Sequence, residues 1–350
     1  MAPESTTRPW LSHYAALTAL ATVGLIALGG LVTSHGVGMA VPDWPTTYGY
    51  NMFLFPVSQW VGGIFYEHTH RLYASVVGLM TVILAVGLQL GSKDRRLIRL
   101  GWMALALVVV QGVLGGLRVN LMKDQIGVVH AALAQLFLAL LVIIAVLASP
   151  AWRRWKVSAP AVAPGVRTWV GLATGLILVQ LLVGAGMRHQ HAGLAVPDFP
   201  LAYGRVWPPM DEGFLQRVNA GRMDTRDFHP ITPFHVQLHM AHRVLALGVT
   251  AAVLVAALRL RRAFGVRSGM GRVGTVWVGL VGVQILLGAI TVWSNKAADM
   301  ATAHVVVGAL CLVAGVAAGV FVVGAARVPR AAEAPGELSG ATAPWVGVKS

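Results

Sequence analysis

Four histidines in a duplicated pattern are the side chains best suited to chemistry. The stretch "EHTHRLYASVVGL", which contains His70, matches "HMAHRVLALGVTA", which contains His242. Likewise "VVHAALA", with His130, matches "TAHVVVG", with His304. Each histidine begins or lies within a long apolar run, where an ionisable side chain is costly unless it binds a ligand or pairs with another polar group. The duplication predicts two sites, each with two imidazoles.

Glu67 distinguishes the two halves of this pattern. It precedes His70 by three residues and shares its helix face, whereas the second half carries His239 at the same position. A carboxylate in one pocket only suggests that this pocket performs proton-coupled chemistry and that the other passes electrons. A structural alternative is an ion pair with Arg71 at i+4, and the two roles are compatible.

A haem iron held between two imidazoles would satisfy such a pair. The neutral ring nitrogen binds iron, and the other nitrogen needs only one acceptor. Small residues follow the four histidines at i+4 and would leave room for a flat macrocycle: Ala74, Ala134, Ala246 and Gly308. Two alternatives stay open. Each histidine could hydrogen-bond a neighbouring helix, or His235, His239 and His242, at offsets of four and three, could bind zinc or copper.

Four arginines are candidates for the carboxylates of a haem. Arg71 and Arg243 directly follow two of the histidines, and Arg118 and Arg188 lie at helix ends. A guanidinium group matches a carboxylate in shape and charge, which favours contacts with haem propionates. Such residues can equally anchor a membrane protein to lipid headgroups.

The elements that must position these residues are transmembrane helices. The 350-residue chain is 56% hydrophobic and only 11% charged, and its mean hydropathy is +0.70, which indicates a polytopic membrane protein. Eight apolar runs have about the 20 residues that span a bilayer; they cover 14–34, 63–90, 97–119, 125–148, 168–188, 236–259, 272–293 and 300–323. The first is interpreted as a retained helix, since no cleavage site follows it.

Basic residues predict the orientation of the chain. They gather in alternate connections, at 92–99, 152–156 and 259–267, whereas 36–66 contains no Lys or Arg. The positive-inside rule then places both termini in the cytoplasm and the four histidines near the outer surface of the plasma (inner) membrane. The net charge of +14 therefore reflects topology and lipid contact, not nucleic-acid binding. The single cysteine, Cys311, excludes an intramolecular disulfide.

The predicted fold class is an all-α polytopic membrane protein, with eight transmembrane helices arranged as two parallel-repeat four-helix bundles. The expected divisions are a cytoplasmic N-terminus (1–13), a first half (14–150), a cytoplasmic linker (151–167), a second half (168–323) with an outer insertion (205–235), and a disordered cytoplasmic tail (324–350). The outer loops "AVPDWP" and "AVPDFP" could cover the two pockets.

The duplicated unit, with "EHTHR" in one half, "MAHR" in the other and a single histidine opening each fourth span, resembles the haem A synthase family over about 14–323. The resemblance implies oxidation of the C8 methyl group of haem O to a formyl group, by two hydroxylations and loss of water. It implies that His242 and His304 ligate the iron of haem b. His70 and His130 would flank the iron of the substrate haem O, with Glu67 as the catalytic carboxylate.

The resemblance also implies partners: haem O synthase as supplier, an unknown electron donor, and cytochrome oxidase assembly as recipient. In one respect the sequence departs from the family. Many relatives have a pair of outer-loop cysteines where this chain has Val41 and Thr47, so a mechanism that needs a loop thiol is excluded. The competing hypotheses are a di-haem b-type cytochrome that relays electrons from quinol, and a transporter whose pockets are empty.

Overall fold

Eight long helices form the body of the protein in the computed structural model, which describes residues 7–123, 125–158, 161–222 and 229–325. They are α1 (Pro9–Ser34), α2 (Gly62–Gly91), α3 (Arg95–Asn120), α4 (Gln125–Ala148), α6 (Pro164–His189), α8 (Pro233–Phe264), α9 (Gly269–Trp293) and α10 (Ala298–Gly324). Each of the eight is long and apolar enough to cross a membrane. The predicted number of spans and the all-α membrane class are confirmed.

The helices extend beyond the predicted apolar runs, mostly at their N-termini. Three begin with proline, Pro9, Pro164 and Pro233, whose fixed φ suits the first helical position. Thr232 caps α8 by accepting a hydrogen bond from the backbone N–H of His235. An apolar-run criterion detects only the part inside the hydrocarbon core. The remaining turns lie outside the apolar runs and so escape this criterion.

Two short helices and a small hairpin were not predicted. Helix α5 (Pro150–Ser158) lies in the expected linker, and α7 (Glu212–Ala220) lies in the expected insertion. The hairpin consists of β1 (Thr46–Thr47) and β2 (Tyr50–Asn51), paired antiparallel. All are too short and too polar to show the 20-residue apolar signal. The expected tail falls almost entirely outside the described residues.

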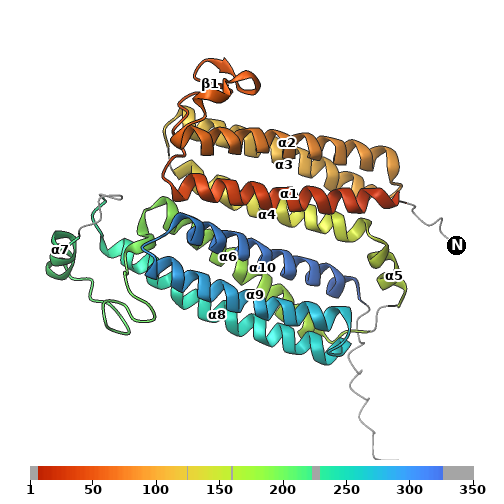
Figure 1. Ribbon diagram of the computed structural model, residues 1–350. Coiled ribbons are helices and arrows are strands. Elements are labelled where there is room, and N and C mark those ends of the chain that lie inside the picture. The colour runs from red at the N-terminus through yellow and green to blue at the C-terminus, as the bar shows by residue number, and fades with distance from the viewer. Residues whose placement is uncertain (1–6, 124, 159–160, 223–228, 326–350) are drawn as a thin grey trace, which may run out of the picture.

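The long helices pack as two groups of four (Figure 1). In the first bundle α1 contacts α2 and α4, and α3 contacts the same two helices, so α2 and α4 face one another across the diagonal. The second bundle repeats this arrangement, with α8 and α10 on its diagonal. The two bundles meet where α1 and α4 pack against α10 and α6. All four histidines therefore lie on diagonal helices.

The loops at the two ends of the bundles differ strongly. Segments 35–61, 190–222 and 229–232 lie at one end, here called the outer end, and α5 lies at the other (Figure 1). Helix α7 stands beyond the outer ends of the helices, whereas the β1 hairpin stands beside the first turns of α2 (Figure 1). A small apolar core that includes Leu215 and Ile231 holds the α7 region together.

Candidate functional site

Each of the four histidines contacts a glycine of the neighbouring helix. The pairs are His70 with Gly29, His130 with Gly115, His242 with Gly184 and His304 with Gly288, where a Cβ on the glycine would lie 3.1, 3.5, 3.2 and 3.1 Å from the ring Cε1. The small residues expected beside the rings were those one turn along the same helix. The glycines on the neighbouring helices were not predicted. These glycines could have been found by aligning the two halves, because Gly29 matches Gly184 and Gly115 matches Gly288 in the duplicated sequence.

The rings of the second pair are as far apart as two ligands of one metal would be. The ring centroids of His242 and His304 are 6.3 Å apart and the rings are inclined by 60°. Two imidazoles on opposite sides of one metal, with bonds of about 2.0–2.1 Å, have centroids about 6 Å apart. The Nδ1 of His304 donates to the backbone carbonyl of Gln284 at 3.1 Å, so Nε2 is the nitrogen that could bind a metal. In this structure Nε2 lies 3.4 Å from the side-chain nitrogen of Gln284. These residues fit a bis-histidine haem.

The rings of His70 and His130 share the environment of the second pair. Their Nδ1 atoms, like that of His242, are enclosed by protein and have no hydrogen-bond partner among the described residues. The rings are only partly buried and belong to α2 and α4, which face one another across the diagonal of the first bundle. Imidazoles in this setting are available to a ligand between α2 and α4.

The alternative of a zinc or copper site finds no support. Within the described ranges, no group of three His, Cys, Asp or Glu side chains could hold a metal ion. The Nδ1 of His235 accepts from the backbone N–H of Thr232 at the start of α8. The Nδ1 of His239 accepts from the backbone N–H of Val196 at 3.3 Å. Two of the three candidate ligands therefore serve local structure.

Glu67 holds the first outer loop. Its carboxylate is 4% exposed, accepts from the backbone N–H of Val41 at 2.9 Å and pairs with Arg71 at 2.6 Å. The residue at the same position of the second half, His239, accepts from Val196, the counterpart of Val41. The same loop contact is thus made by a carboxylate in one bundle and by an imidazole in the other.

Arg71 and Arg243 bind the outer loops, although the sequence predicted haem carboxylates as their partners. Arg71 donates to the carbonyl oxygens of Val41, Asp43 and Thr46. Arg243 makes the corresponding contacts with Val196, Asp198 and Leu201. Carbonyls in a sharply turning loop lack helical partners and need other donors, which a guanidinium group supplies.

The other two predicted arginines line a cavity at the outer end of the molecule. Arg118 and Arg188 lie on this cavity of about 690 Å³, together with Lys296 and His189. Its walls come from both bundles. Thr33 and Arg118 belong to the first bundle, and Arg188, His189 and Lys296 belong to the second. Arg188 also donates to the carbonyl of Gly30 and to the hydroxyl of Ser34, across the boundary between the bundles. Carboxylates of a haem in either bundle would find their cationic partners here.

Trp44 closes the outer end of the first bundle over α3. A Cβ at Gly116 would overlap its indole ring, and Asn120 donates to its carbonyl at 3.2 Å. In the second bundle Trp293 donates in the same way to the carbonyl of Phe199 at 3.1 Å. The loops expected to cover the pockets are therefore fastened to the third helix of each bundle.

Replacing Gly116 with alanine should displace Trp44. The added methyl group overpacks a filled site, which costs about 1–3 kcal/mol. We expect a lower melting temperature and faster proteolysis of the segment around Trp44. Gly112→Ala is the matched control, because Gly112 lies one turn earlier on α3 and a Cβ there meets nothing within 4 Å. Equal behaviour of the two variants would show that Trp44 does not pack as described.

The first outer loop depends on one carboxylate. Burial alone would raise the pKa of Asp43, but hydrogen bonds from the backbone of Gly49, the hydroxyl of Thr46 and the backbone of Tyr48 hold it below its ordinary value. Because the pKa of Asp43 is lower in the folded loop, its carboxylate stabilises the loop fully at pH values above about 3.9, the ordinary pKa of an unfolded Asp. This stabilisation is lost as the pH falls through the pKa that Asp43 has in the folded loop.

We therefore expect pepsin to cut the segment 43–49 only below about pH 4. Asp43→Asn lacks the charged acceptor and should be cut at every acidic pH at which pepsin is active, so comparing the two chains at the same pH removes the pH dependence of pepsin itself. Cleavage of the unmodified chain that begins well above pH 4 would contradict the contacts assigned to Asp43.

Together, the fold and the site define a class: a membrane protein of two four-helix bundles, each with a histidine pair on its diagonal helices. Comparison with known families agrees. A family profile described as cytochrome oxidase assembly protein, COX15-CtaA, matches residues 50–316, which is more than half of the chain. The protein belongs to this family.

Several curated relatives share the similarity. A heme A synthase of Alkalihalophilus pseudofirmus is 28% identical over 215 residues, 59% of this chain and 71% of the relative. A heme A synthase of Symbiobacterium thermophilum is 34% identical over 190 residues, 52% of this chain and 60% of the relative. A heme A synthase of Methylobacterium radiotolerans is 27% identical over 324 residues, 83% of this chain and 84% of the relative.

Proposed function

We propose that this protein is a haem A synthase, which oxidises the C8 methyl group of haem O to a formyl group by two hydroxylations and loss of water. The observation that carries the proposal is the duplicated histidine pair, with a carboxylate beside it in the first bundle only. Membership of the COX15-CtaA family and similarity to heme A synthases support it.

His242 and His304 are the proposed axial ligands of a haem b. Bound there, haem b would supply one-electron transfer. Gly184 and Gly288 allow the two rings to approach their neighbouring helices closely. The Gln284 carbonyl accepts from Nδ1 of His304, so Nε2, which lies 3.4 Å from the side-chain nitrogen of Gln284, is the nitrogen that would bind the iron.

His70 and His130 are the proposed residues that flank haem O in the first bundle. Trp44 and the loop held by Arg71 limit the access of water to this bundle from the outer end. The propionates of both haems would be bound by Arg118 and Arg188, whose guanidinium groups line the cavity between the bundles.

Glu67 is the proposed proton-handling group of the first bundle. Its carboxylate lies one helical turn before His70 and already carries an ion pair with Arg71. A carboxylate at this position can accept a proton or stabilise a developing positive charge on the substrate. The second bundle, with His239 at this position, lacks such a group.

Topology and partners follow from the same proposal. We place the outer end on the outside of the plasma membrane and both termini in the cytoplasm, since the basic connections lie at the opposite end. Haem O synthase would supply the substrate, and the product would enter cytochrome oxidase assembly.

The deciding experiment is pigment analysis. Cells that make haem O and express the chain should yield haem A or its hydroxylated precursor on extraction. The control is the same strain with the Glu67→His variant, which should accumulate haem O. If the unmodified chain also yields haem O alone while showing two bound haems, the protein is an electron relay and not a synthase.

A further inference from the structure

A histidine that the proposed chemistry does not use fastens the first outer loop to the outside of its bundle. His68 is fully buried, and its Nδ1 lies 3.2 Å from the hydroxyl of Thr47. Its ring contacts Phe55 and Trp60, with centroids 5.1 and 4.8 Å away. His68 is two residues from His70, a rotation of about 200° around the helix. The loop therefore covers the face of α2 that points away from the bundle interior.

The position of His68 along α2 sets the depth of this loop. His68 is six residues after Gly62, the start of α2, which is about 9 Å along the helix axis. Helix α2 has 30 residues, or about 45 Å at 1.5 Å per residue, whereas the hydrocarbon core is about 30 Å thick. The loop thus lies beside the part of α2 that passes through the outer interface.

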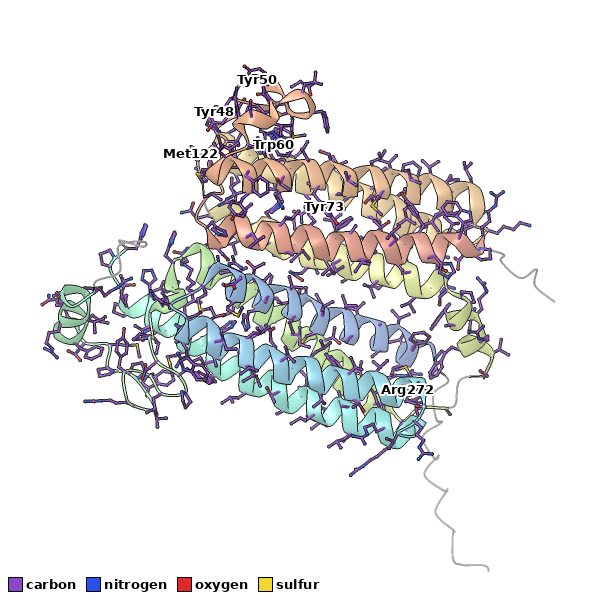
Figure 2. The ribbon with its side chains drawn as sticks, viewed as in Figure 1. Tyr48, Tyr50, Trp60, Tyr73, Met122 and Arg272 are labelled. Carbon is purple, nitrogen blue, oxygen red and sulfur yellow. The ribbon has the colours of Figure 1, made fainter. Side chains whose placement is uncertain are left out.

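The figures show the same placement. The β1 hairpin lies beside the first turns of α2, on the side away from the second bundle (Figure 1). Figure 2 shows Tyr48, Tyr50 and Trp60 in this region, with Tyr50 farthest from the helices. The α7 region, by contrast, extends past the helix ends in the direction of the helix axes (Figure 1). Among the described residues of the two outer segments, those of the β1 hairpin are displaced sideways from the helix ends (Figure 1).

The surface of this loop is apolar. Residues 48–61, here called the apolar outer loop, contain no charged side chain. Phe53, Leu54, Val57 and Val61 are 67, 77, 75 and 63% exposed. Phe65 and Leu79 of α2 are also exposed, at 47 and 61%. Leu79 is eleven residues after His68, about 20° beyond three full rotations, so it lies on the face of α2 that the loop covers. The matching segment of the second half carries charges instead, at Arg205, Asp211, Glu212 and Arg217.

We propose that the apolar outer loop is inserted into the outer leaflet and contacts lipid at the boundary between headgroups and acyl chains. An exposed apolar patch of this kind marks an interaction surface. Tyr and Trp side chains favour the membrane interface, and the absence of charge suits an apolar surface that enters it. The continuity with the lipid-facing side of α2 identifies lipid as the partner. This proposal is independent of the proposed enzymatic function.

Spin labels can measure the environment of the loop directly. In a Cys311→Ala background, Leu54→Cys or Val57→Cys is labelled with a nitroxide and the full chain is placed in proteoliposomes. Collision with oxygen, which concentrates in lipid, is compared with collision with a water-soluble nickel chelate. Val206→Cys, at an 86% exposed position of the second half, and Leu79→Cys, at a 61% exposed position of α2, are the aqueous and lipid controls.

We expect the oxygen-to-nickel ratio at both loop positions to exceed that at residue 206 several-fold and to approach that at residue 79. A ratio equal to that at residue 206 would show that the loop lies in water and overturn the proposal. Low collision with both reagents would show that a second copy of the chain or another protein covers the loop, which would also overturn it.

Discussion

Replacing His304 with alanine is expected to abolish the low-spin bis-histidine haem b spectrum of the purified protein. His304 and His242 are the pair whose rings stand 6.3 Å apart. Removing either leaves at most one imidazole for the iron, so its spin state changes or the haem is lost. The measurement is the visible absorption spectrum of the reduced protein, with haem content determined on the same sample.

The controls separate ligation from general damage. His242→Ala should have the same effect as His304→Ala, because the two residues are proposed to bind the same iron. His229→Ala should leave the spectrum unchanged, since His229 is an exposed residue of the insertion that stacks on His191. His70→Ala should also retain the low-spin spectrum of haem b. Retention of the spectrum in both His242→Ala and His304→Ala would place haem b elsewhere.

Replacing Glu67 with alanine is expected to reduce haem O turnover about 100-fold or more, the usual contribution of a positioned acid or base. The low-spin spectrum of haem b should persist, because the second bundle is untouched. The assay is the rate at which added haem O is converted to the hydroxylated or formyl haem, relative to bound haem b.

The structure makes a sharper variant necessary, because Glu67 also fastens the loop. Glu67→Ala breaks a buried ion pair and removes the acceptor for Val41. Glu67→His copies the second half, where His239 accepts the equivalent N–H, and so keeps a loop acceptor without a carboxylate. We expect Glu67→His to be as inactive as Glu67→Ala. Restored turnover in Glu67→His would show that Glu67 only positions the loop.

The sequence was sufficient to predict the architecture. Apolar runs of bilayer length predict each long helix, because hydrophobicity is what inserts a helix into lipid. The duplication predicts two similar bundles, and the order of the helices places His70, His130, His242 and His304 at one level. These features depend on the length of apolar runs and on the repetition of motifs, both of which can be read from a single sequence.

Contacts between helices could be predicted only in part. The glycines against the histidine rings, such as Gly29 and Gly288, depend on which helix faces meet, and many other glycines in the chain touch nothing. Arg71 was assigned to haem carboxylates because the folded path of the outer loop, with its unpaired carbonyls, is not visible in the sequence. The packing of the first outer loop against His68 was not foreseen either.

An experimental structure of the haem-loaded protein, with the iron atoms located by anomalous scattering, is the most direct test of the paired histidines. We expect one iron between the Nε2 atoms of His242 and His304, and a second between His70 and His130 when haem O is supplied. Iron bound outside these pairs, or contacting only one histidine of the second pair, would contradict the proposed function.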